Sequence, residues 1–69
     1  MYQEISIIEN NDKLTTRLKG IFEKEKDYIF NCIDPKNVLD GIKSIPDLII
    51  IDEDNINEDV IEICSLIRN

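Results

Sequence analysis

An uninterrupted aliphatic run, Leu48 to Ile51, stands between Asp47 and Asp52. The run lacks the polar alternation of a strand with one face in water, so it predicts a strand covered on both faces. Such strands are typical of parallel sheets packed between helices. Pro46 cannot donate a ladder hydrogen bond and favours an extended residue before it, which suits the start of a strand over residues 47–52.

Two further strands are expected. Glu4 to Glu9 is rich in isoleucine and precedes a turn-like Asn-Asn-Asp, and Tyr28 to Ile33 combines aromatic residues with isoleucines. Asn31 lies in the middle of the second of these segments, which favours a sheet edge over the sheet centre. Tyr28 and Phe30 are expected to be packing residues.

Three helices are expected between and after these strands. Asn11 or Asp12 can cap the first helix by accepting amide protons of its first turn, and this helix should end within residues 23–27. Asp34 and Pro35 form a start signal for the second, and the third should begin near residues 57–59. Helical spacing predicts these core-facing residues: Leu14, Leu18, Ile21 and Phe22; Val38, Leu39, Ile42 and Ile45; Ile61, Cys64 and either Leu66 or Ile67.

Strand and helix therefore alternate three times over residues 1–69, which predicts one α/β domain with parallel strands and right-handed crossovers. A chain of this length buries only about 60% of its unfolded surface, so its margin of stability is thin.

The composition excludes several classes of function. Eight basic residues against fifteen acidic ones give a net charge of -7, which disfavours nucleic acid and anionic membranes as partners. No apolar stretch approaches the roughly 20 residues that cross a bilayer. The nucleotide-binding spacings of the dinucleotide fingerprint and the P-loop are both missing.

Cysteine usage indicates a reduced, cytoplasmic setting. Cys32 and Cys64 are too few for a disulfide scaffold, and there is no signal-peptide pattern. Because the chain has no histidine and no paired cysteines, zinc is not expected. Both thiols are predicted to be small core residues.

Three consecutive acids, Asp52, Glu53 and Asp54, follow the aliphatic run. In open α/β sheets, ligands bind at the carboxyl ends of the strands. A carboxylate cluster at that end favours a divalent cation or a carboxylate nucleophile. The alternative is a solvated acidic turn after a buried strand.

With these segments in place, the chain resembles the first half of a response-regulator receiver domain. The stretch ISIIENND stands where that family has an apolar strand that ends in an acidic pair. The stretch PDLIIIDEDNINEDVIEICSLIR is similar to the family's third strand, loop and third helix. The resemblance implies a flavodoxin-like fragment of three strand–helix units, residues 1–69, with parallel strand order 2-1-3 and helices on both faces of the sheet.

The resemblance also implies a function in two-component signalling. Asp52 would accept a phosphoryl group from a sensor histidine kinase, with Mg²⁺ held by Asp52, by Glu9 and Asn10 of the acidic-pair positions, and by the backbone carbonyl of Asp54. A receiver of this kind is not itself an enzyme.

Some positions depart from the family pattern. Asn10 stands where an acid usually binds the metal, so Mg²⁺ should bind more weakly. Ile56 and Val60 replace the usual proline and glycine, which leaves the loop less constrained. These departures favour the alternative of a degenerate receiver that is not phosphorylated and serves as a protein-interaction module.

Two further expectations follow. The sequence Asp-Glu-Asp after an aliphatic run also resembles haloacid-dehalogenase-type phosphotransferases, with Asp52 as nucleophile and Asp54 as general acid, but in that family the motif closes the first strand. The edge of the third strand, which a fourth strand covers in receivers, would be bare, and we expect a homodimer or a swapped assembly through it.

Overall fold

The computed structural model describes residues 2–42 and 45–68. Within them, three strands and three α-helices alternate along the chain. The elements are β1 (Gln3–Ile8), α1 (Lys13–Ile21), β2 (Tyr28–Ile33), the short 3₁₀-helix η1 (Pro35–Asn37), α2 (Val38–Gly41), β3 (Leu48–Ile51), a second 3₁₀-helix η2 (Glu53–Asn55), and α3 (Val60–Arg68). Each strand begins and ends within one residue of its expected bounds.

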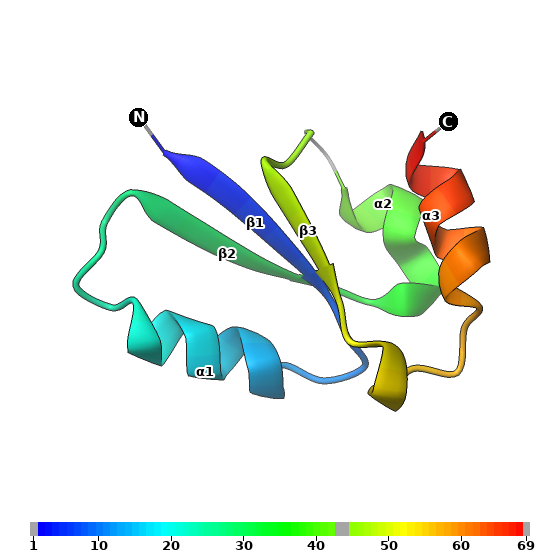
Figure 1. Ribbon diagram of the computed structural model, residues 1–69, viewed down its shortest axis with the longest axis horizontal. Coiled ribbons are helices and arrows are strands. Elements are labelled where there is room, and N and C mark those ends of the chain that lie inside the picture. The colour runs from blue at the N-terminus through cyan, green and yellow to red at the C-terminus, as the bar shows by residue number, and fades with distance from the viewer. Residues whose placement is uncertain (1, 43–44, 69) are drawn as a thin grey trace.

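The three strands form one parallel sheet in the order β2-β1-β3. Helix α1 lies on one face of the sheet, and α2 and α3 lie together on the other (Figure 1). The α/β class, the parallel pairing and the strand order 2-1-3 are therefore confirmed. The chain reaches this arrangement because β1 is followed by a helix on one face and β2 by a helix on the opposite face.

The core lies between the sheet and the α2–α3 layer. Ile8 is fully buried at the centre of a cluster with Ile33, Val38 and Ile63, which join β1, β2, α2 and α3. The fully buried Ile7 is the preceding residue of β1. Because β1 has a neighbour on each side, its last residues are the most completely covered part of the sheet.

Helix α1 differs from its predicted form. It ends at Ile21, before residues 23–27, and Ile21 is 65% exposed although it was predicted to be a core residue. The buried residue of α1 is instead Thr15, while Leu14 and Leu18 are half-buried. The helix packs mainly along β2, the edge strand, so the side chains of its far end have little sheet beneath them.

Aromatic rings close the gap between the end of α1 and β2. Phe22 lies 5.6 Å from Tyr28 and 5.9 Å from Phe30, measured between ring centroids. The predicted packing role of Tyr28 and Phe30 is confirmed. Edge-to-face and tilted pairs of this kind add about 0.5–1.5 kcal/mol each beyond the apolar area they bury.

The second helical segment starts as predicted but ends early. Asp34 caps it, because its Oδ1 accepts the backbone N–H of Lys36 at 2.9 Å. Helix α2 then ends at Gly41, where a β-carbon would lie only 2.7 Å from Cγ2 of the Ile33 side chain. Leu39 is 62% exposed and Ile45 is 95% exposed, so these two core predictions are wrong. The predicted row of apolar residues does not extend to Ile45 because α2 ends one turn earlier, at Gly41.

Strand β3 and helix α3 are also less covered than predicted. Leu48 is 52% exposed and the remaining residues of β3 are half-buried, because among residues 2–42 and 45–68 β3 pairs only with β1 and forms an edge of the sheet. In α3, which begins at Val60, Ile61 is 78% exposed, against the prediction, and Ile63 takes the core position.

The cysteine prediction is half wrong. Cys64 is half-buried in α3, but Cys32, on the edge strand β2, is exposed. Its thiol donates to the backbone carbonyl of Asn11, with 3.5 Å between sulfur and oxygen. Over residues 2–42 and 45–68, no helix is long and apolar enough to cross a membrane.

Candidate functional site

The carboxyl ends of the three strands lie side by side. Ile8 of β1 is in register with Ile33 of β2 and with Ile51 of β3. The ladder continues one residue further, because Glu9 N–H donates to the carbonyl of Ile33 at 3.2 Å and Asp52 N–H donates to the carbonyl of Ile8 at 3.0 Å. The predicted convergence of the Glu9 and Asp52 ends in a parallel arrangement is confirmed.

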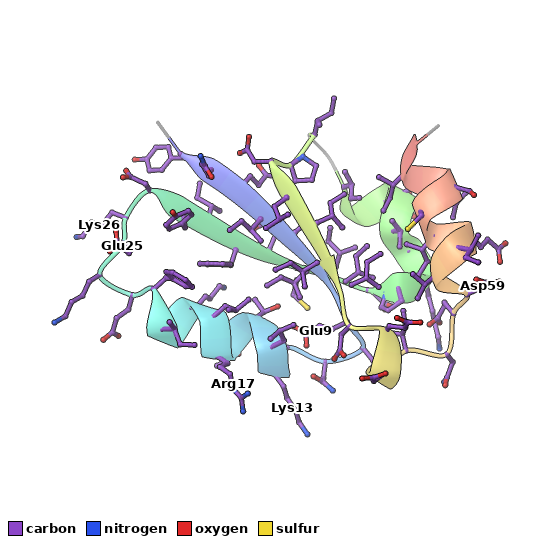
Figure 2. The ribbon with its side chains drawn as sticks, viewed as in Figure 1. Glu9, Lys13, Arg17, Glu25, Lys26 and Asp59 are labelled. Atoms are coloured by element: carbon purple, nitrogen blue, oxygen red, sulfur yellow. The ribbon has the colours of Figure 1, made fainter. Side chains whose placement is uncertain are left out.

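Glu9 is a buried anchor for helix α1. Its side chain is 2% exposed and lies where the sheet meets the start of the helix (Figure 2). One carboxylate oxygen accepts the backbone N–H of Leu14 at 3.0 Å, and the other accepts the N–H of Thr15 at 2.8 Å and the Thr15 hydroxyl at 2.5 Å. A negative charge is favourable there because the free amides of a first helical turn carry partial positive charge.

The capping of α1 is therefore shared between two residues. Asn11 Oδ1 accepts the N–H of Lys13 at 3.0 Å, so its predicted capping role is confirmed. Asp12 occupies the formal cap position but makes no side-chain cap hydrogen bond. The larger contribution of Glu9 was missed, because a cap normally directly precedes its helix, whereas Glu9 lies at the strand end.

Asp52 is half-buried directly after β3, at the start of η2. It borders a hollow of about 280 Å³, and the other described residues that line it come from the first two turns of α1: Lys13, Leu14 and Arg17. Sequence reasoning missed both cations. Their spacing of four residues was visible as a signal, because residues four apart share a helical face, but their nearness to Asp52 depends on how α1 packs.

The other predicted site residues are more exposed. Asn10 is exposed in the loop after β1, and Asp54 is exposed in η2 together with Glu53. The structure therefore brings Asp52, Glu9 and the backbone of η2 to one edge of the sheet. It separates the roles of the two acids, since Glu9 serves the helix and Asp52 borders the hollow.

The side chains of the predicted Mg²⁺ ligands do not form a metal-binding cluster in the described structure. Within the described part of the chain, no three acid, cysteine or histidine side chains group closely enough to hold a metal. Both oxygens of Glu9 already accept hydrogen bonds from α1. Mg²⁺ keeps several waters and needs only one or two carboxylates. Asp52, the Asn10 amide oxygen and the Asp54 carbonyl remain the predicted ligands, and the metal stays a prediction.

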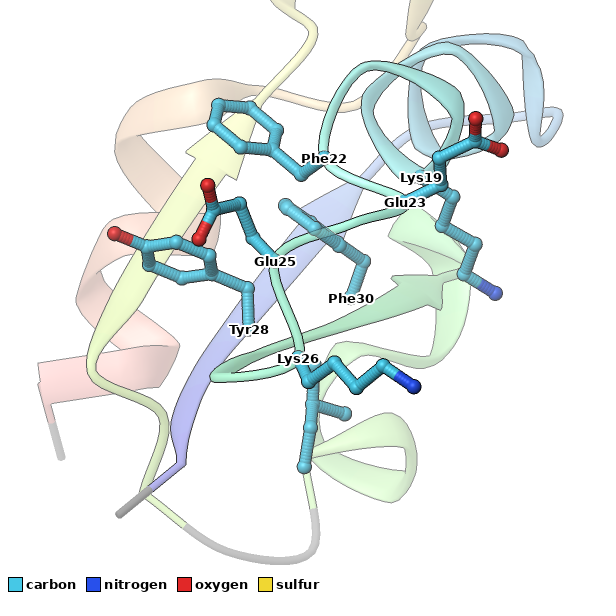
Figure 3. A pocket seen from close by; sticks show the side chains of 8 residues that line it. Lys19, Phe22, Glu23, Glu25, Lys26, Tyr28 and Phe30 are labelled. Carbon is cyan, nitrogen blue, oxygen red and sulfur yellow. The ribbon is translucent and has the colours of Figure 1, made fainter.

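A second, larger hollow lies elsewhere. It measures about 460 Å³ and opens between the end of α1, the following loop and β2. Figure 3 shows the rings of Phe22, Tyr28 and Phe30 on one side of it and the ammonium groups of Lys19 and Lys26 on the other. Its walls are packing residues and solvated charges, and it contains none of the predicted site residues.

Comparison of the chain with protein-family models, with curated proteins and with solved structures finds no match.

Proposed function

We propose that this chain is a receiver module of two-component signalling, in which Asp52 accepts a phosphoryl group from a phosphohistidine on a sensor kinase. A carboxylate oxygen of Asp52 attacks phosphorus and forms an O–P bond. The P–N bond to the imidazole breaks, its electron pair stays on nitrogen, and the kinase histidine is released. In this proposal the β2-β1-β3 sheet is part of a flavodoxin-like fold.

The observation that carries the proposal is the placement of Asp52. It lies at the carboxyl end of a parallel strand, half-buried, beside a hollow. Asp52 N–H donates to the Ile8 carbonyl, which holds the backbone of Asp52 next to the end of β1. A reacting carboxylate needs a fixed backbone position and a side chain that the donor can reach, because phosphoryl transfer depends mostly on positioning and charge neutralisation.

The neighbouring residues have distinct tasks in this mechanism. Glu9 holds the first turn of α1 against the sheet end and so shapes one wall of the hollow. Bound at Asp52, Asn10 and the Asp54 carbonyl, Mg²⁺ would supply positive charge toward the phosphoryl oxygens. The exposed carboxylates of Glu53 and Asp54 add negative charge at the rim, which makes cations at this site necessary.

Labelling with a small phosphodonor tests the proposal. The intact chain is incubated with acetyl phosphate and Mg²⁺ and then examined by mass spectrometry. We expect the mass of one phosphoryl group to be added, to be removed by hydroxylamine as acyl phosphates are, and to be absent from Asp52→Asn. Asp54→Asn is the control for charge, and it should still be labelled. Labelling that persists in Asp52→Asn, or no labelling of the wild-type chain, would refute the phosphoacceptor role.

A second candidate is a non-phosphorylated interaction module. The incomplete burial of the edge strand β3 favours it. Apolar hollows lie on both faces beside this edge strand, one lined by Ile5, Leu48 and Ile50 among others and one by Ile49, Ile51, Cys64 and Ile67. An edge with apolar surface on both faces favours pairing with another chain.

Association of two copies through β3 predicts a concentration-dependent dimer in sedimentation, and Leu48→Lys should shift it to monomer. A folded monomer at high concentration would exclude this association.

A further inference from the structure

We infer that Lys13 and Arg17 form an oxyanion-binding pair that holds the phosphoryl group over Asp52, so that α1 itself supplies cations for the transfer. The inference rests on the proposed function for its chemical role, but the binding of a phosphate-like dianion is a separate property of the hollow. Its first basis is geometric. Both residues line the hollow that Asp52 borders, and they stand four positions apart on α1.

The two cations share one side of the helix. Figure 2 shows Lys13 and Arg17 extending from the same side of α1, with Lys13 at the end of the helix close to Glu9. Both side chains are exposed, so their charged ends can move to meet an anion without breaking a buried contact. An ammonium group and a guanidinium group together provide up to eight N–H donors, and guanidinium favours bidentate contact with phosphate oxygens.

The second basis is the distribution of charge, because basic residues are few in this acidic chain. The chain has a net charge of -7 and only eight basic residues, so most of its surface repels anions. Lys13 and Arg17 line this hollow together with Asp52, the exposed carboxylates of Glu53 and Asp54 lie at its rim, and the nearby Glu9 is buried and bonded to α1. A phosphoryl dianion that enters this hollow therefore depends on Lys13 and Arg17 to offset the surrounding carboxylates.

The volume also suits the ligand. The hollow of about 280 Å³ has room for a phosphoryl group together with several ordered waters, each of which needs about 30 Å³. Leu14, which is half-buried, provides the apolar part of its lining. The hollow is open on one side, as entry of a donor such as a phosphohistidine requires.

The test measures anion binding without metal. The intact chain, isotope-labelled, is titrated with inorganic phosphate in EDTA at constant ionic strength, and backbone-amide NMR reports the site. We expect saturable shifts confined to the first two turns of α1 and to residues 52–54. Lys13→Ala/Arg17→Ala should weaken binding about tenfold. The matched control is Lys19→Ala/Lys24→Ala, which removes the same charge from other positions and should bind as the wild type does.

Two further variants sharpen the result. Asp52→Asn removes a negative charge beside the hollow and should tighten phosphate binding several-fold, whereas weaker binding would contradict the inference. Arg17→Lys should retain part of the affinity that Arg17→Ala loses. Shifts that do not saturate, or that are equal in the double variant and its control, would overturn the oxyanion pair.

Acetyl phosphate labelling separates this inference from the proposed function. If phosphate binds in the predicted way but no acyl phosphate forms, the oxyanion pair stands and the phosphoacceptor role fails. If Asp52 is labelled at the same rate in the Lys13→Ala/Arg17→Ala variant as in the control, the phosphoacceptor role stands and the oxyanion pair fails. The expected result for both is labelling that is about tenfold slower in the double variant than in the control.

Discussion

Glu9→Ala should lower the free energy of unfolding by about 2–4 kcal/mol, because it leaves donors at the start of α1 without their acceptor. The Glu9 carboxylate accepts the N–H groups of Leu14 and Thr15 and the Thr15 hydroxyl, and it is 2% exposed. Small domains have total stabilities near the low end of about 5–15 kcal/mol, so much of the protein would unfold.

Urea denaturation followed by circular dichroism measures this effect. Glu9→Gln retains one carbonyl acceptor in a side chain of similar size, so its loss should be intermediate. Glu23→Ala is the matched control, since Glu23 is exposed in the turn after α1 and should change stability by no more than about 0.5 kcal/mol. Equal midpoints for Glu9→Ala and Glu23→Ala would show that the buried carboxylate does not stabilise the helix.

Ile8→Ala should cost a similar or larger amount, about 2–5 kcal/mol, because it opens a cavity at the centre of the core. Ile8 is fully buried and packs in the cluster with Ile33, Val38 and Ile63. It also directly precedes Glu9, and its carbonyl accepts the N–H of Asp52. A loosened core at this point would therefore disturb the site as well as the fold.

The chain offers a matched control for this change. Ile21→Ala removes the same atoms from a residue that is 65% exposed, and its effect should stay within about 0.5 kcal/mol. The comparison of the two urea midpoints cancels the differences that isoleucine and alanine cause in the unfolded chain. If both variants unfolded at the same urea concentration, the core would not be centred on Ile8.

The position of the candidate site in the sheet was predictable, but the contacts of its individual residues were not. The aliphatic runs that end at Ile8 and Ile51 placed Glu9 and Asp52 at the carboxyl ends of parallel strands, and they lie there. The distinct tasks of the two acids were not visible. The Glu9 carboxylate accepts the backbone N–H groups of Leu14 and Thr15, which lie within hydrogen-bonding distance once α1 packs against the sheet.

Burial was predicted well near the centre of the sheet and poorly away from it. Helical spacing correctly selected Val38, but it also selected Ile21, Leu39 and Ile61, which are exposed. Apolar residues at helical spacing show that a helix has an apolar side, but they do not show whether another element packs against every turn of it. At the ends of α1 and α2, and along the edge strands, the described chain has little to cover these residues.

The alternation of strands and helices and the strand bounds could be derived from the amino-acid order, because apolar periodicity and capping signals act over a few residues. The strand order followed from the resemblance of particular segments to a known domain and is confirmed. Three features became visible only in the folded chain: Glu9 anchors α1, Ile63 rather than Ile61 joins the core, and Lys13 and Arg17 line the same hollow as Asp52. These outcomes depend on how a helix docks on the sheet, and docking brings together residues whose distance along the chain carries no periodic signal.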